Sequence, residues 1–74
     1  MSAVFTSRPE NYKRNISEGR RTVAHPAILT GPEATEPGVV IFAAGRLRMV
    51  LPAADAIRVA DAIVDALETV QETA

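Results

Sequence analysis

The side chains that could do acid–base chemistry begin with a single histidine. His25 stands before Pro26, and no cysteine or carboxylate is near it in the sequence. General base catalysis needs a second group that orients the histidine, and the sequence offers no such pairing. A lone histidine in a strand-like stretch is more often structural or exposed than catalytic, so we expect a structural role for His25.

A second candidate is a group of carboxylates near the C-terminal end. Asp61, Asp65 and Glu68 are spaced by four and three residues, which puts them on one face of a helix. They could bind a cation, but an ordinary solvated ridge, with Arg58 as a partial counter-charge, has the same spacing. We favour the solvated ridge.

Composition and motifs argue against the remaining site chemistries. The chain has no cysteine and one histidine, which excludes disulfides, thiolate metal sites and a histidine-rich zinc site. No phosphate-binding loop, nucleophile elbow or zinc-ligand spacing occurs. We therefore predict that the protein is not an enzyme and uses no metal, cofactor or small-molecule substrate.

Basic side chains are concentrated in the first part of the chain. Residues 1–31 hold five basic and two acidic residues, a charge of +3, whereas residues 32–74 hold three basic and seven acidic residues, a charge of −4. The basic residues of the first part are Arg8, Lys13, Arg14, Arg20 and Arg21. They could contact phosphates, with Tyr12 stacking on a base, or the acidic surface of a partner protein. The pI of about 5.7 argues against a nucleic-acid domain.

The elements that position these groups lie mainly in residues 38–70, which hold most of the strongly apolar side chains. Residues 39–44 and 46–51 are predicted to form two strands around a turn at Gly45. The first of these strands is apolar on both faces, which is typical of a strand covered on both sides. A helix is predicted to begin at Pro52, because proline suits the first helical position.

The register of the predicted hairpin has two alternatives. A two-residue loop pairs Phe42 with Leu47, whereas a three-residue loop with a left-handed Gly45 pairs Ile41 with Leu47. Because alanine at position 44 is a poor residue for the positive φ of a type I′ turn, we expect the three-residue loop.

In either register the second strand has an apolar face and an arginine-bearing face. The apolar face carries Leu47, Met49 and Leu51. The other face carries Arg46, Arg48 and Val50. An apolar patch with arginine at its edge suits a protein interface, and a β-ribbon that reads a DNA major groove is the alternative.

The predicted helix has an apolar stripe opposite its acidic ridge. The stripe comprises Ala53, Ala56, Ile57, Ala60, Ile63, Val64, Leu67 and Val70. A 20-residue helix is about 30 Å long, and a six-residue strand is about 20 Å long. The end of the helix around Leu67 and Val70 should therefore project beyond the hairpin and need another surface.

Residues 1–37 are predicted to form an extended basic arm and linker. No helical or strand period is sustained, although a short helical turn is expected near residues 11–16 and an edge strand at residues 22–30. Pro26 restricts that strand to a sheet edge because proline cannot donate a ladder hydrogen bond. The prolines, glycines and acids of residues 31–38 indicate a solvated linker or turn.

We therefore predict an α+β fold in which a β-hairpin, with the strand at 22–30 as a third member, packs on one long C-terminal helix after an extended N-terminal arm. Residues 1–37 form the arm and residues 38–74 the core. A core of this size usually needs a staple or a partner. We expect a non-enzymatic interaction or assembly protein that associates with itself or docks on a larger protein. The expected interface residues are Val40, Phe42, Arg46, Arg48, Ile63, Leu67 and Val70.

Two other functions remain open: a small dimeric DNA-binding regulator, and an inhibitor whose acidic helix occupies a partner's basic groove. No stretch is long enough for a signal peptide or a bilayer span. We therefore expect no membrane partner, and a location in the cytoplasm or in a particle assembled inside the cell. Arginine outnumbers lysine seven to one and alanine is abundant, as in GC-rich bacteria such as actinobacteria and their phages. A small structural or accessory protein from such a source fits this bias.

Overall fold

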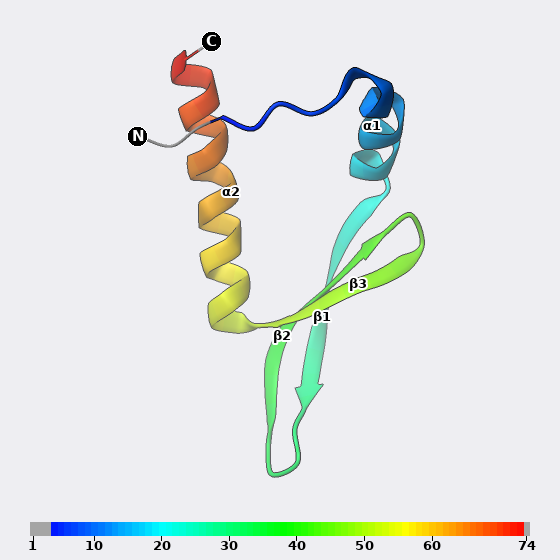
Figure 1. Ribbon diagram of the computed structural model, residues 1–74. Coiled ribbons are helices and arrows are strands. Elements are labelled where there is room, and N and C mark those ends of the chain that lie inside the picture. The colour runs from blue at the N-terminus through cyan, green and yellow to red at the C-terminus, as the bar shows by residue number, and fades with distance from the viewer. Residues whose placement is uncertain (1–3, 74) are drawn as a thin grey trace.

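The computed structural model describes residues 4–73, and its strands and helices follow one another along the chain as shown in Figure 1. The elements are η1 (Pro9–Asn11), α1 (Tyr12–Arg20), β1 (Thr22–Thr30), β2 (Thr35–Ala43), β3 (Arg46–Pro52) and α2 (Ala53–Thr73). Residues 1–3 of the predicted arm and residue 74 of the predicted core segment lie outside the described residues. The predicted α+β fold, with a sheet followed by one long C-terminal helix, is confirmed.

The three strands form one antiparallel sheet in the order β1-β2-β3. The strand predicted at residues 22–30 is β1, and it occupies an edge of the sheet. Pro26 is tolerated there because an edge strand has hydrogen-bonded neighbours on one side only. β2 lies in the centre, which agrees with its apolar composition.

The segment expected to be a linker is shorter than predicted. Gly31 donates a backbone hydrogen bond to the Ala34 carbonyl oxygen at 2.8 Å, which closes a tight turn. β2 begins immediately afterwards at Thr35, so residues 35–38 belong to a strand and not to a linker. The physical reason is the regular pairing with β1, which runs from Thr22 opposite Ala43 to Thr30 opposite Thr35.

The helix before the sheet is also longer than the turn expected near residues 11–16. α1 extends for nine residues, and Gly19 does not interrupt it. The Thr22 hydroxyl donates a hydrogen bond to the Glu18 carbonyl oxygen at 2.6 Å, and the Arg21 amide donates to the same oxygen at 3.2 Å. These two bonds satisfy one of the carbonyl acceptors that the end of a helix leaves free.

The loop between β2 and β3 contains two residues, so the prediction of a three-residue loop is wrong. Ala43 pairs with Arg46, and the two loop residues both have positive φ, 55° at Ala44 and 77° at Gly45. Positive φ at both positions is the geometry of a type I′ turn. The Ala44 amide donates to the Arg21 carbonyl oxygen at 3.3 Å, which helps to hold alanine in this unfavourable conformation.

A β-bulge in β3 changes which side chains share a face. Phe42 lies opposite Leu47, but the preceding Ile41 lies opposite Met49, so Arg48 is an extra residue in the strand. Leu47 and Met49 consequently lie on opposite faces of the sheet. The prediction that Leu47, Met49 and Leu51 share one face is therefore wrong.

The cross-strand pairs define two faces of the sheet. The helix face, on the side of α2, carries Ala24, Val39, Ile41, Met49 and Leu51. The open face carries Val23, Val40, Phe42, Leu47 and Val50. Arg46, opposite Ala43, belongs to the helix face, whereas Val50, opposite Val40, belongs to the open face. The arginine-bearing face predicted for β3 is thus split by the bulge.

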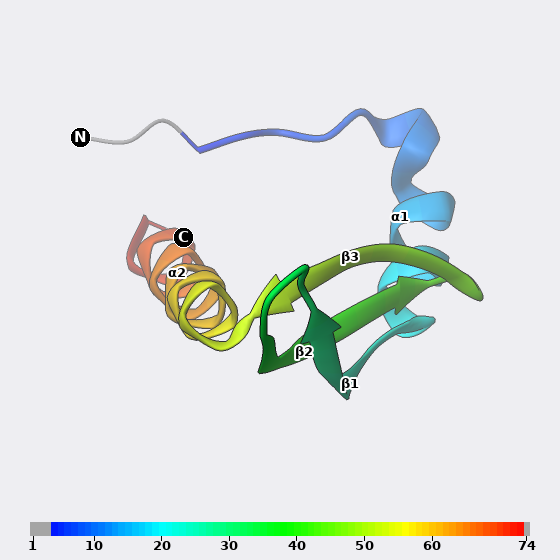
Figure 2. The same cartoon turned by 90° about the horizontal axis from the view of Figure 1, so that it is seen from below.

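α2 leaves the end of β3 and projects away from the sheet (Figures 1 and 2). Ala56 and Val59 in its first half are partly buried, whereas every residue between 60 and 72 is exposed. The predicted overhang is therefore larger than the last turn around Leu67 and Val70.

The described chain has no buried residue. Its accessible surface is 6418 Å², whereas a compact monomer of this mass exposes about 4,400 Å². Its radius of gyration is 15.3 Å, against about 11 Å for a compact domain of the same length. The fold is therefore an open one, with much apolar surface left uncovered.

Candidate interaction surfaces

The first candidate surface is an apolar cleft between the helix face of the sheet and the first half of α2. It encloses about 300 Å³. The sheet contributes Ala24, Val39, Ile41 and Leu51, and the helix contributes Ala56, Val59, Ala60 and Ile63. All eight side chains are apolar, so the cleft has no group that could recognise a polar ligand. It can take up apolar side chains of a partner.

The open face of the sheet is the second candidate surface. Val23, Leu47 and Val50 on this face are exposed, and Val40 and Phe42 are only half-buried. The imidazole ring of His25 meets the Phe42 ring edge-on, with ring centroids 6.1 Å apart and an interplanar angle of 66°. An edge-on aromatic contact of this kind is a packing interaction. It accounts for His25 as part of an apolar face, in line with the expected structural role.

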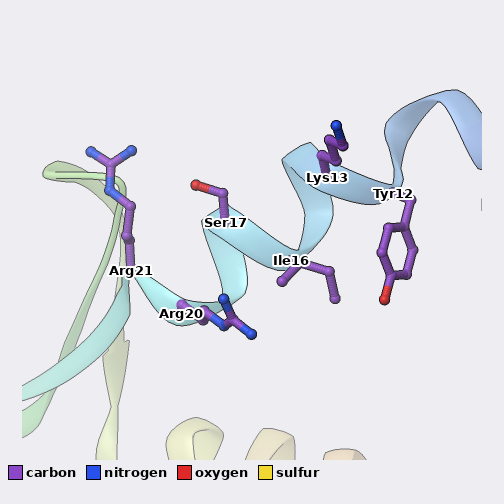
Figure 3. A pocket seen from close by; sticks show the side chains of 6 residues that line it. All are labelled: Tyr12, Lys13, Ile16, Ser17, Arg20 and Arg21. Atoms are coloured by element: carbon purple, nitrogen blue, oxygen red, sulfur yellow. The ribbon is translucent and has the colours of Figure 1, made fainter.

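α1 provides a third surface, which is basic. A shallow depression of about 430 Å³ runs along it. Its lining residues, drawn in Figure 3, are Tyr12, Lys13, Ile16, Ser17, Arg20 and Arg21. Tyr12, Ile16 and Arg20 project from one side of the helix, and Lys13, Ser17 and Arg21 project from the other (Figure 3). Tyr12 and Ile16, at positions i and i+4, form an apolar pair on this helix. Tyr12 is 65% exposed and Ile16 is 38% exposed, so the rest of the chain covers the pair only in part.

The fourth surface is the acidic ridge of α2, which consists of Asp61, Asp65, Glu68 and Glu72. Within residues 4–73, the ion pair formed is the one between Arg58 and Asp55 on the first half of α2, at 3.3 Å and with both side chains exposed. The ridge and the basic residues of α1 are therefore not neutralised by one another inside the described chain.

The predicted interface residues do not form one surface. Val40 and Phe42 lie on the open face, Arg46 lies at the hairpin end of the helix face, and Arg48 is the bulge residue. The three helical residues are all exposed on α2, and they are Ile63, Leu67 and Val70. Ile63 belongs to the apolar cleft, while the other two lie beyond it. The set is divided between the two sides of the sheet and the free half of the helix.

The predicted basic residues are gathered more closely. Lys13, Arg14 and Arg20 are on α1, Arg21 caps its C-terminal end, and Arg8 precedes η1. The sequence did not identify Tyr12 and Ile16 as a surface, because the segment around them was not expected to be a continuous helix. Their spacing of four residues was the signal that could have found it.

The described residues provide neither a membrane-spanning helix nor a metal-binding cluster. Between residues 4 and 73 no helix is both long and apolar enough to cross a membrane. The same part of the chain contains no group of three or more histidine, cysteine, aspartate or glutamate side chains placed to hold a metal ion. The chain matches no protein-family model, no curated protein and no solved structure.

Proposed function

We propose that this protein is a non-enzymatic interaction or assembly subunit whose fold is completed by a partner protein. The observation that supports the proposal is that no described residue is buried, although the chain is rich in large apolar side chains. A folded chain needs buried apolar surface to offset the entropy lost on ordering its backbone and side chains. This chain on its own buries too little, so a second protein surface has to supply the rest.

The amount of uncovered surface suits such a partner. The chain exposes 6418 Å², roughly 2,000 Å² more than a compact chain of its mass. A standard protein–protein interface takes about 800 Å² from each partner. The excess is therefore large enough for one extensive interface or for two ordinary ones.

The chemistry of the uncovered surface indicates a protein partner. The cleft beside α2 and the open face of the sheet are apolar, and the exposed half of α2 combines apolar side chains with carboxylates. Apolar patches with charged margins are typical of protein interfaces. A carboxylate ridge repels the phosphates of nucleic acid and of anionic lipid.

The proposal is tested by asking whether the isolated chain folds as a monomer. Hydrogen exchange and urea unfolding, followed by circular dichroism, should show weak amide protection and no cooperative transition when the chain is monomeric. Both should appear once the interface is occupied. A monomer confirmed by light scattering that nevertheless unfolds in one steep cooperative transition would contradict the proposal.

One observation favours a second candidate, a small DNA-binding regulator. Lys13, Arg20 and Arg21 share the α1 depression with Tyr12, a set that could contact phosphates and stack on a base. Gel shifts on duplex DNA at low salt test this candidate. A shift that weakens steeply as salt is added would support it, and the absence of a shift at low salt would remove it.

A further inference from the structure

We propose that the partner is a second copy of this chain, and that α1 of each copy packs antiparallel along the free apolar face of α2 of the other. This inference rests on the proposed function and names the partner that it requires. It is supported by two complementary surfaces, one on α1 and one on α2, which do not contact each other within a single chain.

The surface on α2 is the apolar row that faces away from the sheet. Ile57 and Val64 form this row, and they are 64% and 54% exposed. Asp61 and Glu68 of the acidic ridge lie directly beside it, because at 3.6 residues per turn they follow Ile57 and Val64 by one turn. A partner helix that covers the row therefore meets carboxylates along one edge.

The surface on α1 has the same layout with the opposite charge. Tyr12 and Ile16 are its apolar pair, and Arg20 projects from the same side of the helix (Figure 3). The backbone position of Lys13 is only about 20° from that of Arg20 around the helix axis, at the margin of this side, and its flexible side chain points toward the Ser17 side in Figure 3. No residue of α1 is buried in the chain. α1 therefore presents an apolar strip with a cationic edge.

The position of the charges on each helix fixes the direction of packing. Viewed from its own N-terminus, each helix carries its charged row on the same rotational side of its apolar row. When two such helices face each other, these rows lie side by side only if the helices run in opposite directions; a parallel pair would put them at opposite edges. Antiparallel packing thus aligns Lys13 and Arg20 with Asp61 and Glu68.

The arrangement of one chain allows this contact to form twice in a dimer. In the view of Figure 1 α1 runs downward and α2 upward, and the two helices stand apart in both views, although Figure 2, which looks nearly along α2, shows α1 inclined to it. A two-fold axis along α2 leaves these opposite senses unchanged, so α1 of each copy runs in the sense opposite to α2 of the other. The same contact is then repeated by symmetry, as in most homodimers.

A chain cannot make this contact with itself. α1 is fastened beside the β2–β3 turn, because Thr22 donates to the Glu18 carbonyl oxygen and Ala44 donates to the Arg21 carbonyl oxygen. α2 begins at the other end of β3, after Pro52. A strand of this length separates the two attachment points by about 20 Å. The complementary surfaces therefore require two copies.

The experiment uses two full-length charge-reversed variants and sedimentation velocity. The first is Lys13→Glu with Arg20→Glu, and the second is Asp61→Lys with Glu68→Lys. Wild type should be a dimer, and each variant alone should raise the dimer dissociation constant by at least about tenfold, because like charges then face each other at both contacts. An equimolar mixture of the two variants should form a heterodimer of near wild-type affinity, because both contacts then pair opposite charges.

Matched controls carry the same charge changes elsewhere. Arg14→Glu with Arg21→Glu alters the other side of the same helix region, and Glu33→Lys with Glu36→Lys alters the β1–β2 region. Both should leave the dimer within about twofold of wild type, as is usual for isolated surface charges. Circular dichroism of the mixture shows whether rescue of association also restores the fold.

The other outcomes separate this inference from the proposed function. A wild-type dimer that responds to neither reversal, or a mixture that does not associate, overturns the α1–α2 contact and leaves the proposed function standing. If the wild-type chain is monomeric and lacks a cooperative transition, the inference that the partner is a second copy is overturned. The proposed function, in which some partner protein completes the fold, then still stands. A cooperatively folded monomer overturns both. Loss of DNA binding in the first variant with an unchanged dimer would assign α1 to nucleic acid and overturn the inference.

Discussion

Leu47 and Met49, two residues apart on β3, lie on opposite faces of the sheet, because the bulge at Arg48 stands between them. Leu47 joins Phe42 on the open face, and Met49 joins Ile41 on the helix face. In a regular strand both side chains would point to the same side. The bulge therefore places a large apolar residue on each face and leaves neither face polar.

Deletion of Arg48 should be tolerated, because it removes the extra residue and keeps Leu47 opposite Phe42 and Met49 opposite Ile41. We expect the midpoint of urea unfolding, measured at one fixed protein concentration, to stay close to that of the wild type. Deletion of Val50 is the matched control: it falls in regularly paired strand and turns Leu51 to the wrong face. If both deletions are equally damaging, β3 has no bulge.

Gly38→Ala should destabilise the fold by about 1–3 kcal/mol. A methyl group at this position would collide with the Leu51 carbonyl oxygen and with the Leu29 Cδ1 atom, and the carbonyl oxygen belongs to a paired backbone that cannot move freely. Gly19→Ala is the control, since its added methyl group meets nothing within 4 Å. Urea unfolding of both variants checks the difference; equal stability of the two would show that β2 and β3 do not approach closely at Gly38.

Ala44→Gly should stabilise the fold by about 1 kcal/mol, because alanine pays a steric penalty at positive φ that glycine does not. The φ of 55° at Ala44 is the observation behind this sign. Ala43→Gly, one residue earlier in β2, should instead destabilise by about 0.5–1 kcal/mol. Thermal unfolding tests this prediction: the midpoint of Ala44→Gly should be higher than that of the wild type, and the midpoint of Ala43→Gly should be lower. If Ala44→Gly instead destabilises the protein, that result would support the three-residue loop.

Local patterns in the sequence were sufficient for most of the fold. The edge strand at residues 22–30 was signalled by β-branched residues around Pro26, and the long helix after Pro52 by its apolar stripe and its acidic ridge. The turn and the bulge were not accessible in this way. They depend on contacts across strands, such as the hydrogen bond from Ala44 to Arg21, which override the poor preference of alanine for positive φ.

The candidate surfaces were predictable only in part. The exposed end of α2 followed from helix length alone, since no hairpin of this size can cover 21 residues of helix. The sequence could not show that the strand residues Val40 and Phe42 lie on a different side of the sheet from the helical residues Ile63 and Leu67. That result depends on which face of the sheet α2 covers. The sequence predicted only a short helical turn near residues 11–16 and not the full length of α1, because the segment has no long apolar period.

Val64→Asp should weaken association by about tenfold or more, because it puts a charge into the apolar row beside Asp61 and Glu68. Val64 is 54% exposed and does not line the cleft, so the contact between α2 and the sheet should be unaffected. Ala62→Asp is the matched control on another side of the same helix. Sedimentation equilibrium compares the two; equal dissociation constants would remove Val64 from the interface.

The central claim, that a second copy completes this fold, is tested most directly by the dependence of urea unfolding on protein concentration. If folding and dimerisation are one event, a hundredfold increase in concentration stabilises the folded state by about 2.8 kcal/mol. The midpoint should then rise by on the order of 1 M urea. Dissociation of the dimer and unfolding of the chain should occur over the same range of urea concentration. A midpoint that does not change over this range, with a cooperative transition throughout, would show that one chain folds alone and would contradict the claim.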